Sequence, residues 1–181
     1  MRFAWDRGLE WEKERKKLLR LIRQEEENGG VRSIKQVAYL VVLYIQLSNG
    51  MRISEAAEAA IKFAQTGKRE VEVRVRKRKD GTLRKVIIPR EVARYRPQLR
   101  AVVAEVDEDP HRLAERVRIW ASRHLGNTHA FRYAFIGYLA KKGVAAQIIA
   151  KITGHKKLDY VLHYTQKVRA EEILEEVVNG D

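Results

Sequence analysis

Five polar residues are spaced along the chain in an order that could attack a phosphodiester bond. They are Arg52 in Gly50-Met51-Arg52-Ile53-Ser54-Glu55, His129 and Arg132 in His129-Ala130-Phe131-Arg132, His155 directly after Gly154, and Tyr164. Two guanidiniums can hold phosphate oxygens, two imidazoles can transfer protons or donate hydrogen bonds, and a phenol can act as the nucleophile. Together these residue types predict the cleavage of a phosphodiester by a tyrosine.

Taken one at a time, the same residues have ordinary structural explanations. Arg132 could pair with a carboxylate and His129 could cap a helix, which is the commoner role for such a pair. His155 could simply begin a helix, and Tyr164 could be a buried aromatic side chain. Only the combination of residue types and their order points to chemistry.

The helix that we expect over residues 128–142 places His129 and Arg132 on one face near its first turn. Thr128 can cap this helix, and the N-terminal end of a helix favours an anion. Apolar side chains between residues 131 and 139 predict that its other faces are buried. The polar pair should therefore be held rigidly, with room for a phosphate.

The motifs and their spacing resemble the catalytic domain of the tyrosine recombinases, the phage-type integrases. That family has an arginine in a Gly-x-Arg-x-Ser-Glu turn, then His-x-x-Arg, then Gly-His, and a tyrosine downstream. Here His155 follows Arg132 by 23 residues and Tyr164 follows His155 by nine, and the resemblance covers residues 33–178. An integrase of an archaeal virus or plasmid is the kind of member that we expect.

The resemblance implies a role for each residue of the set. Tyr164 would form a 3′-phosphotyrosyl intermediate, and His129 would help to remove its proton because a tyrosine ionises only near about pH 10. Arg52 and Arg132 would hold nonbridging phosphate oxygens, and His155 would donate a hydrogen bond to the same phosphate. No metal, nucleotide or other cofactor is implied, because the phosphotyrosyl bond retains the energy of the broken diester.

The family also uses a lysine of a β-hairpin to protonate the departing 5′ oxygen. Residues 71–89 alternate apolar and charged side chains on both sides of Asp80-Gly81, which predicts an antiparallel hairpin with a basic tip. We assign Lys79 to this role, with Lys77 and Lys85 as alternatives. We expect DNA phosphate contacts from Arg74, Arg76, Lys77, Arg78, Arg84, Lys85, Lys156 and Lys157.

The composition favours a polyanionic partner. The 181 residues include 37 Lys and Arg against 24 Asp and Glu, which gives a formal charge of +13 and favours nucleic acid, and the resemblance implies that this is double-stranded DNA. We find no apolar run of about 18 residues and no signal peptide, so we expect a DNA-associated protein of the host cytoplasm with no membrane partner. The absence of cysteine excludes thiolate chemistry, and with 34% charged residues it is compatible with a thermophilic source.

The pattern of helix starts and stops predicts one mainly helical α+β catalytic domain over residues 1–181. A charged helical segment would cover residues 1–30, and the recombinase catalytic fold would cover residues 33–178. We expect helices near residues 5–27, 33–47, 55–63, 90–106, 111–125, 128–142, 145–153, 157–166 and 170–178. Ser54 would cap the third helix, and Asp107-Glu108-Asp109 before Pro110 would be a solvated helix cap and not a metal site.

Two features depart from the family pattern. Only 51 residues precede Arg52, so we expect no separate core-binding domain and, as a result, weak and mostly nonspecific DNA binding. Tyr133 follows Arg132 at a position where the family commonly has a histidine. The apolar stripe of the last helix, residues 170–178, would either pack on its own domain or join a neighbouring protomer of a synaptic tetramer.

Two other functions fit parts of the sequence. A type IB topoisomerase shares the tyrosine chemistry but relaxes supercoils without exchanging DNA partners. A DNA-binding module without catalysis would keep the basic surface alone, and the presence of every catalytic residue type argues against it.

Overall fold

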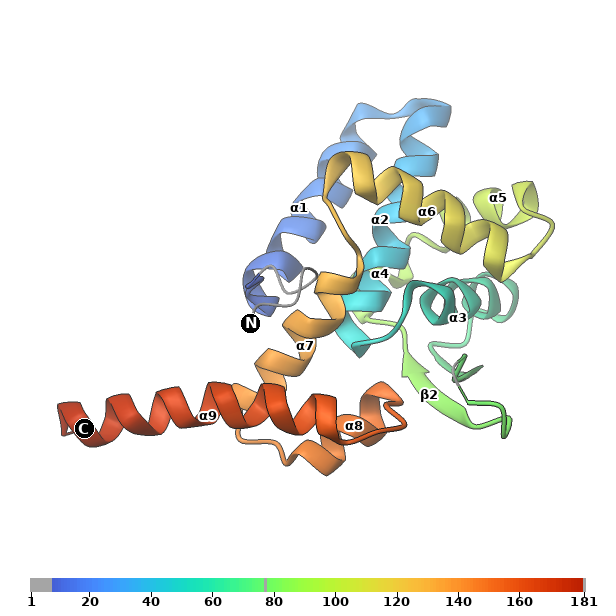
Figure 1. Cartoon of the computed structure of the whole chain (residues 1–181). Coiled ribbons are helices and arrows are strands. Elements are labelled where there is room, and N and C mark those ends of the chain that lie inside the picture. The colour runs from blue at the N-terminus through green and yellow to red at the C-terminus, as the bar shows by residue number, and fades with distance from the viewer. Residues whose placement is uncertain (1–7, 77, 181) are drawn as a thin grey trace.

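The computed structural model describes residues 8–76 and 78–180, and it describes the side chains of these residues except 160, 164 and 167–169. The chain forms a mainly helical body with a small hairpin at one end and a long C-terminal helix extending from it (Figure 1). The elements are α1 (Trp11–Asn28), α2 (Gly30–Asn49), α3 (Ile53–Thr66), β1 (Glu70–Arg74), β2 (Leu83–Ile87), α4 (Arg90–Ala93), α5 (Arg96–Glu105), α6 (Pro110–His124), α7 (His129–Lys141), α8 (Ala146–Thr153) and α9 (Asp159–Asn179). The predicted fold class, mainly α with one antiparallel hairpin, is confirmed.

Helix α2 forms the centre of the main core. Nearly every residue from Val37 to Leu47 is buried, so that α2 is surrounded by α1, α3, α5, α6 and α7. Helix α1 packs its apolar stripe on α2 through Leu18 and Ile22, and the Trp11 indole donates to the Leu47 carbonyl at 2.9 Å. The charged helix predicted at the N-terminus therefore belongs to the same core as the rest of the body.

The turn after α2 depends on a glycine. Gly50 has φ of 60°, a left-handed conformation that a glycine adopts without the steric cost of a side chain. A Cβ at this position would lie 2.1 Å from the Phe135 ring of α7. The absence of a side chain therefore lets α7 approach the end of α2, where Arg52 begins the next helix.

The hairpin has the register that its alternating pattern predicts. Strands β1 and β2 pair antiparallel from Glu70 opposite Ile87 to Arg74 opposite Leu83. The inward residues Val71, Val73 and Val86 join the main core, while the residues between them face outward. Burial of one face fixes the register, and it anchors the hairpin below α3, as Figure 1 shows.

The C-terminal helices have a smaller core of their own. Six buried residues form it: Ile136 and Ala140 of α7, Ala146, Ile149 and Ala150 of α8, and Val161 of α9. Beyond this cluster α9 extends away from the body, and its apolar residues Ile173, Leu174, Val177 and Val178 are exposed. The helix that carries Tyr164 is thus attached to the body mainly through α7 and α8.

Several predicted helix boundaries differ from the structure. The segments 157–166 and 170–178 form the single helix α9, because no glycine or proline stands between them, and Gly180 ends the helix. The expected helix 90–106 is divided into α4 and α5, with Pro97 in the first turn of α5. Helix α1 begins at Trp11, and residues 1–7 lie outside the described part of the chain.

One predicted cap was wrong, Thr128 occupies the predicted N-cap position of α7 without a side-chain bond, and the third cap is confirmed. Arg52, and not Ser54, occupies the N-cap position of α3. The Thr128 side chain makes no capping bond to α7; instead the Asn127 Oδ1 accepts from the His129 backbone N–H at 2.9 Å. Asp109 caps α6 as expected, accepting from two backbone N–H groups.

Candidate active site

Arg52 is held at the start of α3 by a buried carboxylate. Its Nη1 lies 3.0 Å from Glu55 Oε1, and its backbone N–H donates to Glu55 Oε2 at 3.3 Å. The Glu55 side chain is completely buried, whereas the Arg52 side chain is 19% exposed. The ion pair therefore holds Nη1 of the guanidinium in place and leaves part of the side chain accessible to an anion.

Arg132 connects the Arg52 turn to His155. It is 1% exposed, and its Nη1 donates to the Gly50 carbonyl at 3.0 Å. Its Nη2 lies 3.2 Å from both ring nitrogens of His155. The structure thus brings Arg52, Arg132 and His155 together from three separate segments of the chain, as the motif spacing predicted.

The cluster is strongly cationic for a largely buried site. Burial, followed by the nearby Arg52 charge, lowers the pKa of Arg132 to about 9, so this guanidinium remains protonated at neutral pH. Burial lowers the pKa of His155 to about 3, and the charge of Arg132 acts in the same direction. A neutral imidazole therefore lies among arginines that Glu55 offsets only in part, an arrangement suited to an incoming phosphate.

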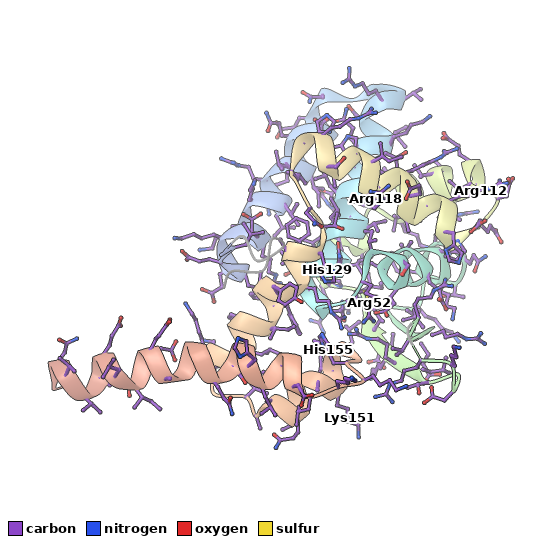
Figure 2. The ribbon with its side chains drawn as sticks, in the orientation of Figure 1. Arg52, Arg112, Arg118, His129, Lys151 and His155 are labelled. Atoms are coloured by element: carbon purple, nitrogen blue, oxygen red, sulfur yellow. The ribbon has the colours of Figure 1, made fainter. Side chains whose placement is uncertain are left out.

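His129 lies beside this cluster at the first residue of α7. Its ring is 5.3 Å from the Tyr133 ring, edge to face, and its charge contributes to the low pKa of His155. Figure 2 shows His129, Arg52 and His155 along the same face of the molecule. The predicted pair of imidazoles is therefore near the two arginines.

Tyr164 is located by its helix alone. It belongs to α9, and its side chain lies outside the described residues. Val161, one turn earlier, is 1% exposed and packs in the cluster that joins α9 to α7 and α8. The helix that bears the predicted nucleophile is thus anchored to the helices that bear Arg132 and Thr153.

The hairpin presents its cations in two ways. Arg74, Lys79 and Lys85 are exposed, Lys79 beside the turn and Lys85 paired with Glu70 at 2.7 Å. Arg76 and Arg78 are half-buried: Arg76 contacts Glu58 and His111, and Arg78 Nη2 lies 3.5 Å from the His155 carbonyl. Lys156 and Lys157, after His155, are exposed, and Lys77 lies outside the described residues.

Arg84 differs from the prediction of a surface DNA contact. It is only 7% exposed, and its Nη groups donate to the carbonyls of Asn49 at 2.6 Å and Thr153 at 3.2 Å. Its Nη1 also lies 3.5 Å from Glu55 Oε2. The alternation that turns Val86 inward places Arg84 on the same face, so the sequence did contain a signal for its burial.

Glu55 and Thr153 belong to the cluster although the motif analysis gave them no role. Glu55 pairs with both Arg52 and Arg84, and its place three residues after Arg52 is the position from which a glutamate caps a helix. Thr153 Oγ1 lies 2.6 Å from the Nδ1 of His155. A threonine two residues before a histidine carries no comparable sequence signal.

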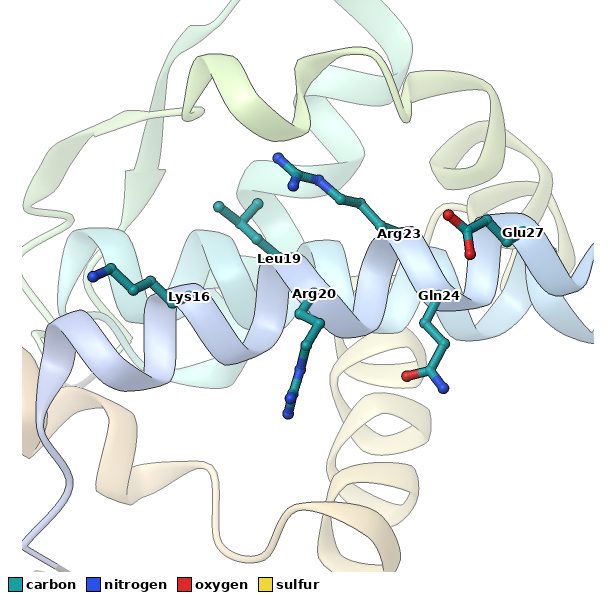
Figure 3. Close-up of a pocket in the computed structure, with 6 residues that line it drawn as sticks. All are labelled: Lys16, Leu19, Arg20, Arg23, Gln24 and Glu27. Atoms are coloured by element: carbon teal, nitrogen blue, oxygen red, sulfur yellow. The ribbon is translucent and has the colours of Figure 1, made fainter.

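A groove elsewhere on the molecule does not contain the predicted catalytic residues. It has a volume of about 890 Å³ and lies beside α1, lined by Lys16, Leu19, Arg20, Arg23, Gln24 and Glu27 (Figure 3). Four of its six lining residues are charged, and all six belong to α1. Within residues 8–76 and 78–180, no helix is both long and apolar enough to cross a membrane.

The fold and the cluster define a basic, mainly helical protein in which buried arginines meet a histidine. Comparison with known proteins places it more closely: the chain belongs to a family of viral integrases. It is 38% identical over 177 residues to a protein named "Putative integrase ORF241" of Acidianus two-tailed virus, an alignment covering 97% of this chain and 70% of the viral protein.

Two further relatives extend the family. An uncharacterized protein of Methanocaldococcus jannaschii is 32% identical over 203 residues, covering 98% of this chain and 91% of its own length. "Putative integrase V10" of Sputnik virophage is 24% identical over 205 residues, covering 95% of this chain and 89% of its own length. No protein-family model matches the chain, and no solved structure matches it.

Proposed function

We propose that the chain is a tyrosine recombinase catalytic domain that cuts and rejoins double-stranded DNA through a 3′-phosphotyrosyl bond at Tyr164. The observation that carries the proposal is the meeting of Arg52, Arg132 and His155 over the buried Glu55. These residues come from three motifs whose order matches that family. The integrase names of two relatives support the same reading.

The chemistry follows from the positions of the charges. A scissile phosphate would accept hydrogen bonds from Arg52 and from Arg132 Nη2, which now faces His155. The Tyr164 oxygen would bond to phosphorus as the bond to the 5′ oxygen breaks, with His129 taking the phenol proton and Lys79 protonating the leaving oxygen. Rejoining reverses these transfers. Loss of one such cationic donor typically lowers a rate by about 10² to 10³.

Exposed cations near the cluster, Lys151, Lys156 and Lys157, support DNA binding. Figure 2 labels Lys151 of α8 near His155 and shows Arg112 and Arg118 on α6, where they pair with Asp107 and Glu115. The exposed hairpin cations are expected to add phosphate contacts. Each neutralised phosphate of duplex DNA changes the slope of log affinity against log salt by about −0.9, so binding should weaken steeply with salt.

Association of protomers is part of the proposal. The far half of α9 exposes Leu174 at 63%, Val177 at 74% and Val178 at 72%, which form an apolar stripe beyond the small C-terminal core. In a synaptic tetramer this stripe would pack on a neighbouring protomer. Burial of these side chains would contribute roughly 25 cal/mol for each Å² of apolar surface removed from water.

Covalent trapping on a nicked suicide DNA substrate tests the proposed chemistry. Wild-type protein should give a protein–DNA band on a denaturing gel, and Tyr164→Phe should abolish it while DNA binding is retained. Tyr160→Phe, on the same helix, is the matched control and should keep the band. If neither wild type nor control gives a band while both bind DNA, a DNA-binding module without catalysis replaces the proposal.

A second assay separates recombination from topoisomerase activity. A recombinase should yield products in which strands of two DNA molecules have been exchanged. Relaxation of supercoiled plasmid without exchanged products would identify the type IB topoisomerase reaction instead.

A further inference from the structure

The hydroxyl of Thr153 contacts both a carbonyl and the ring of His155. Thr153 is the last residue of α8 and is completely buried. Its Oγ1 donates to the Ile149 carbonyl at 2.7 Å and lies 2.6 Å from His155 Nδ1. One buried side-chain oxygen therefore links the end of α8 to the imidazole of the proposed site.

A count of protons identifies the tautomer of His155. A threonine hydroxyl has one hydrogen, and here it is directed to the Ile149 carbonyl, so Oγ1 can only accept from the ring. Nδ1 must then carry the ring proton. Arg132 Nη2, which can only donate, lies 3.2 Å from both ring nitrogens, and with Nδ1 protonated only Nε2 has the lone pair to accept from it. In the opposite tautomer the single hydroxyl hydrogen would have to serve both the Ile149 carbonyl and Nδ1.

We infer that Thr153 is a positioning residue that holds His155 in the Nδ1–H tautomer and turns Nε2 toward Arg132 and the phosphate site. The inference deepens the proposed function and rests on it for the role of the site. The sequence predicted His155 as a hydrogen-bond donor to phosphate. With Nδ1–H committed to Thr153, the ring donates to a phosphate oxygen only after Nε2 has taken up a proton.

The surroundings of the ring explain why Nε2 is unprotonated before DNA arrives. Burial is the largest cause of the low pKa of His155, and the positive charges of Arg132 and His129 on α7, Arg52 before α3 and Arg84 on β2 lower it further. Glu55 is the carboxylate that counters these arginines. A bound phosphate would add negative charge beside the ring and thereby favour proton uptake from solvent at Nε2.

The hairpin in turn holds Thr153. Arg84 donates to the Thr153 carbonyl and, with its other terminal nitrogen, to the Asn49 carbonyl. Gly154 follows with φ of 71°, and a Cβ there would lie 3.1 Å from a methyl group of Val75. The turn that carries His155 is therefore packed against β2 and against Val75, which directly follows β1.

Nuclear magnetic resonance of DNA-free protein tests the tautomer without relying on activity. In ¹⁵N-histidine-labelled wild type, His155 should show a protonated Nδ1 and an unprotonated Nε2, with His155→Gln providing the assignment. Thr153→Val keeps the side-chain shape but removes the acceptor, so the Nδ1–H preference should be lost. Thr153→Ser keeps the hydroxyl and should restore it.

Thr66→Val is the matched control. Thr66 ends α3, donates to the Lys62 carbonyl at 2.7 Å and precedes a left-handed glycine, as Thr153 does in α8. It therefore makes the same helix-end bond without a histidine partner. This variant should leave the His155 tautomer unchanged, which separates the ring contact from a general effect of losing such a hydroxyl.

Single-turnover trapping at saturating protein tests the consequence for the reaction. Thr153→Val should slow formation of the covalent band at least about tenfold while DNA affinity stays within about twofold, and Thr153→Ser should recover the rate. A wild-type ring protonated on Nε2, or a Thr153→Val protein with the wild-type tautomer, would overturn the inference. If wild type forms no covalent band, the proposed function fails, and the resonance experiment still decides the role of Thr153.

Discussion

The body around α2 and the C-terminal unit of α7, α8 and α9 differ in the size of their buried cores. In the body, α2 is buried over most of its length and fixes the Arg52 turn directly. The C-terminal unit has a second core of six residues, and half of α9 lies beyond it. Arg52 thus belongs to the more deeply buried region, Arg132 lies on α7 where the two regions meet, and the predicted nucleophile belongs to the region with less packing around it.

Two buried arginines connect these regions. Arg132 and Arg84 donate to the adjacent carbonyls of Gly50 and Asn49 at the end of α2. Arg132 then faces His155, while Arg84 reaches the Thr153 carbonyl. The proposed site therefore lies where the body contacts the C-terminal unit. Variants of the residues on each side should show different effects on the stability of the two regions.

The largest expected effect is loss of the buried carboxylate that pairs with Arg52 and Arg84. Glu55→Gln leaves Arg52 and Arg84 without their buried carboxylate and should lower the free energy of unfolding by about 3 to 5 kcal/mol. Urea denaturation measures this. Glu58→Gln, which removes a more exposed partner of Lys62 and Arg76, is the control and should cost about 1 kcal/mol or less.

Matched truncations compare the two cores directly. Ile45 and Ile149 are both 0% exposed, one in each core. Ile45→Ala should cost about 4 kcal/mol of global stability, and Ile149→Ala about 2 kcal/mol because the smaller core can relax around the cavity. Hydrogen exchange should accelerate throughout the body in the first variant but only in α8 and α9 in the second. Equal, global effects would contradict the division into two regions.

Acid should loosen the junction between the regions through His155. Its folded pKa of about 3 is below the ordinary value of about 6.5, so the unfolded chain binds more protons between these values. The free energy of unfolding is therefore unaffected by His155 above about pH 6.5 and decreases as the pH falls toward 3. The decrease should be about 1 kcal/mol per pH unit or less, because the ring is partly exposed. Denaturation of His155→Gln at several pH values should show a flatter profile, whereas His124→Gln should match wild type.

The smallest expected effect on folding is at the far end of α9. Leu174→Glu changes an exposed residue and should alter the free energy of unfolding by no more than about 0.5 kcal/mol. The same variant should weaken self-association in sedimentation experiments if the stripe joins protomers. Glu175→Gln on the same helix is the control, and equal association of both proteins would remove α9 from the interface.

The sequence predicted the parts of the molecule that depend on local pattern. The hairpin followed from alternation, and the meeting of Arg52, Arg132 and His155 followed from motif order. The Thr153 contact could not be predicted, since it depends on a turn that the hairpin packs against from elsewhere in the chain. Arg84 was assigned by its charge, although its strand face indicated burial. The split of the body from α9 was also missed, because helix periodicity does not reveal where a second core begins.

The close contact of Gly50 with Phe135 has an evolutionary consequence. Any side chain at position 50 would overlap the aromatic ring, and a smaller residue at position 135 would open a void beside the Arg52 turn. Neither position is free to change alone. Across diverged relatives the two alignment columns should therefore be jointly invariant or covary, and this signature can be sought in genome sequences before any protein is purified.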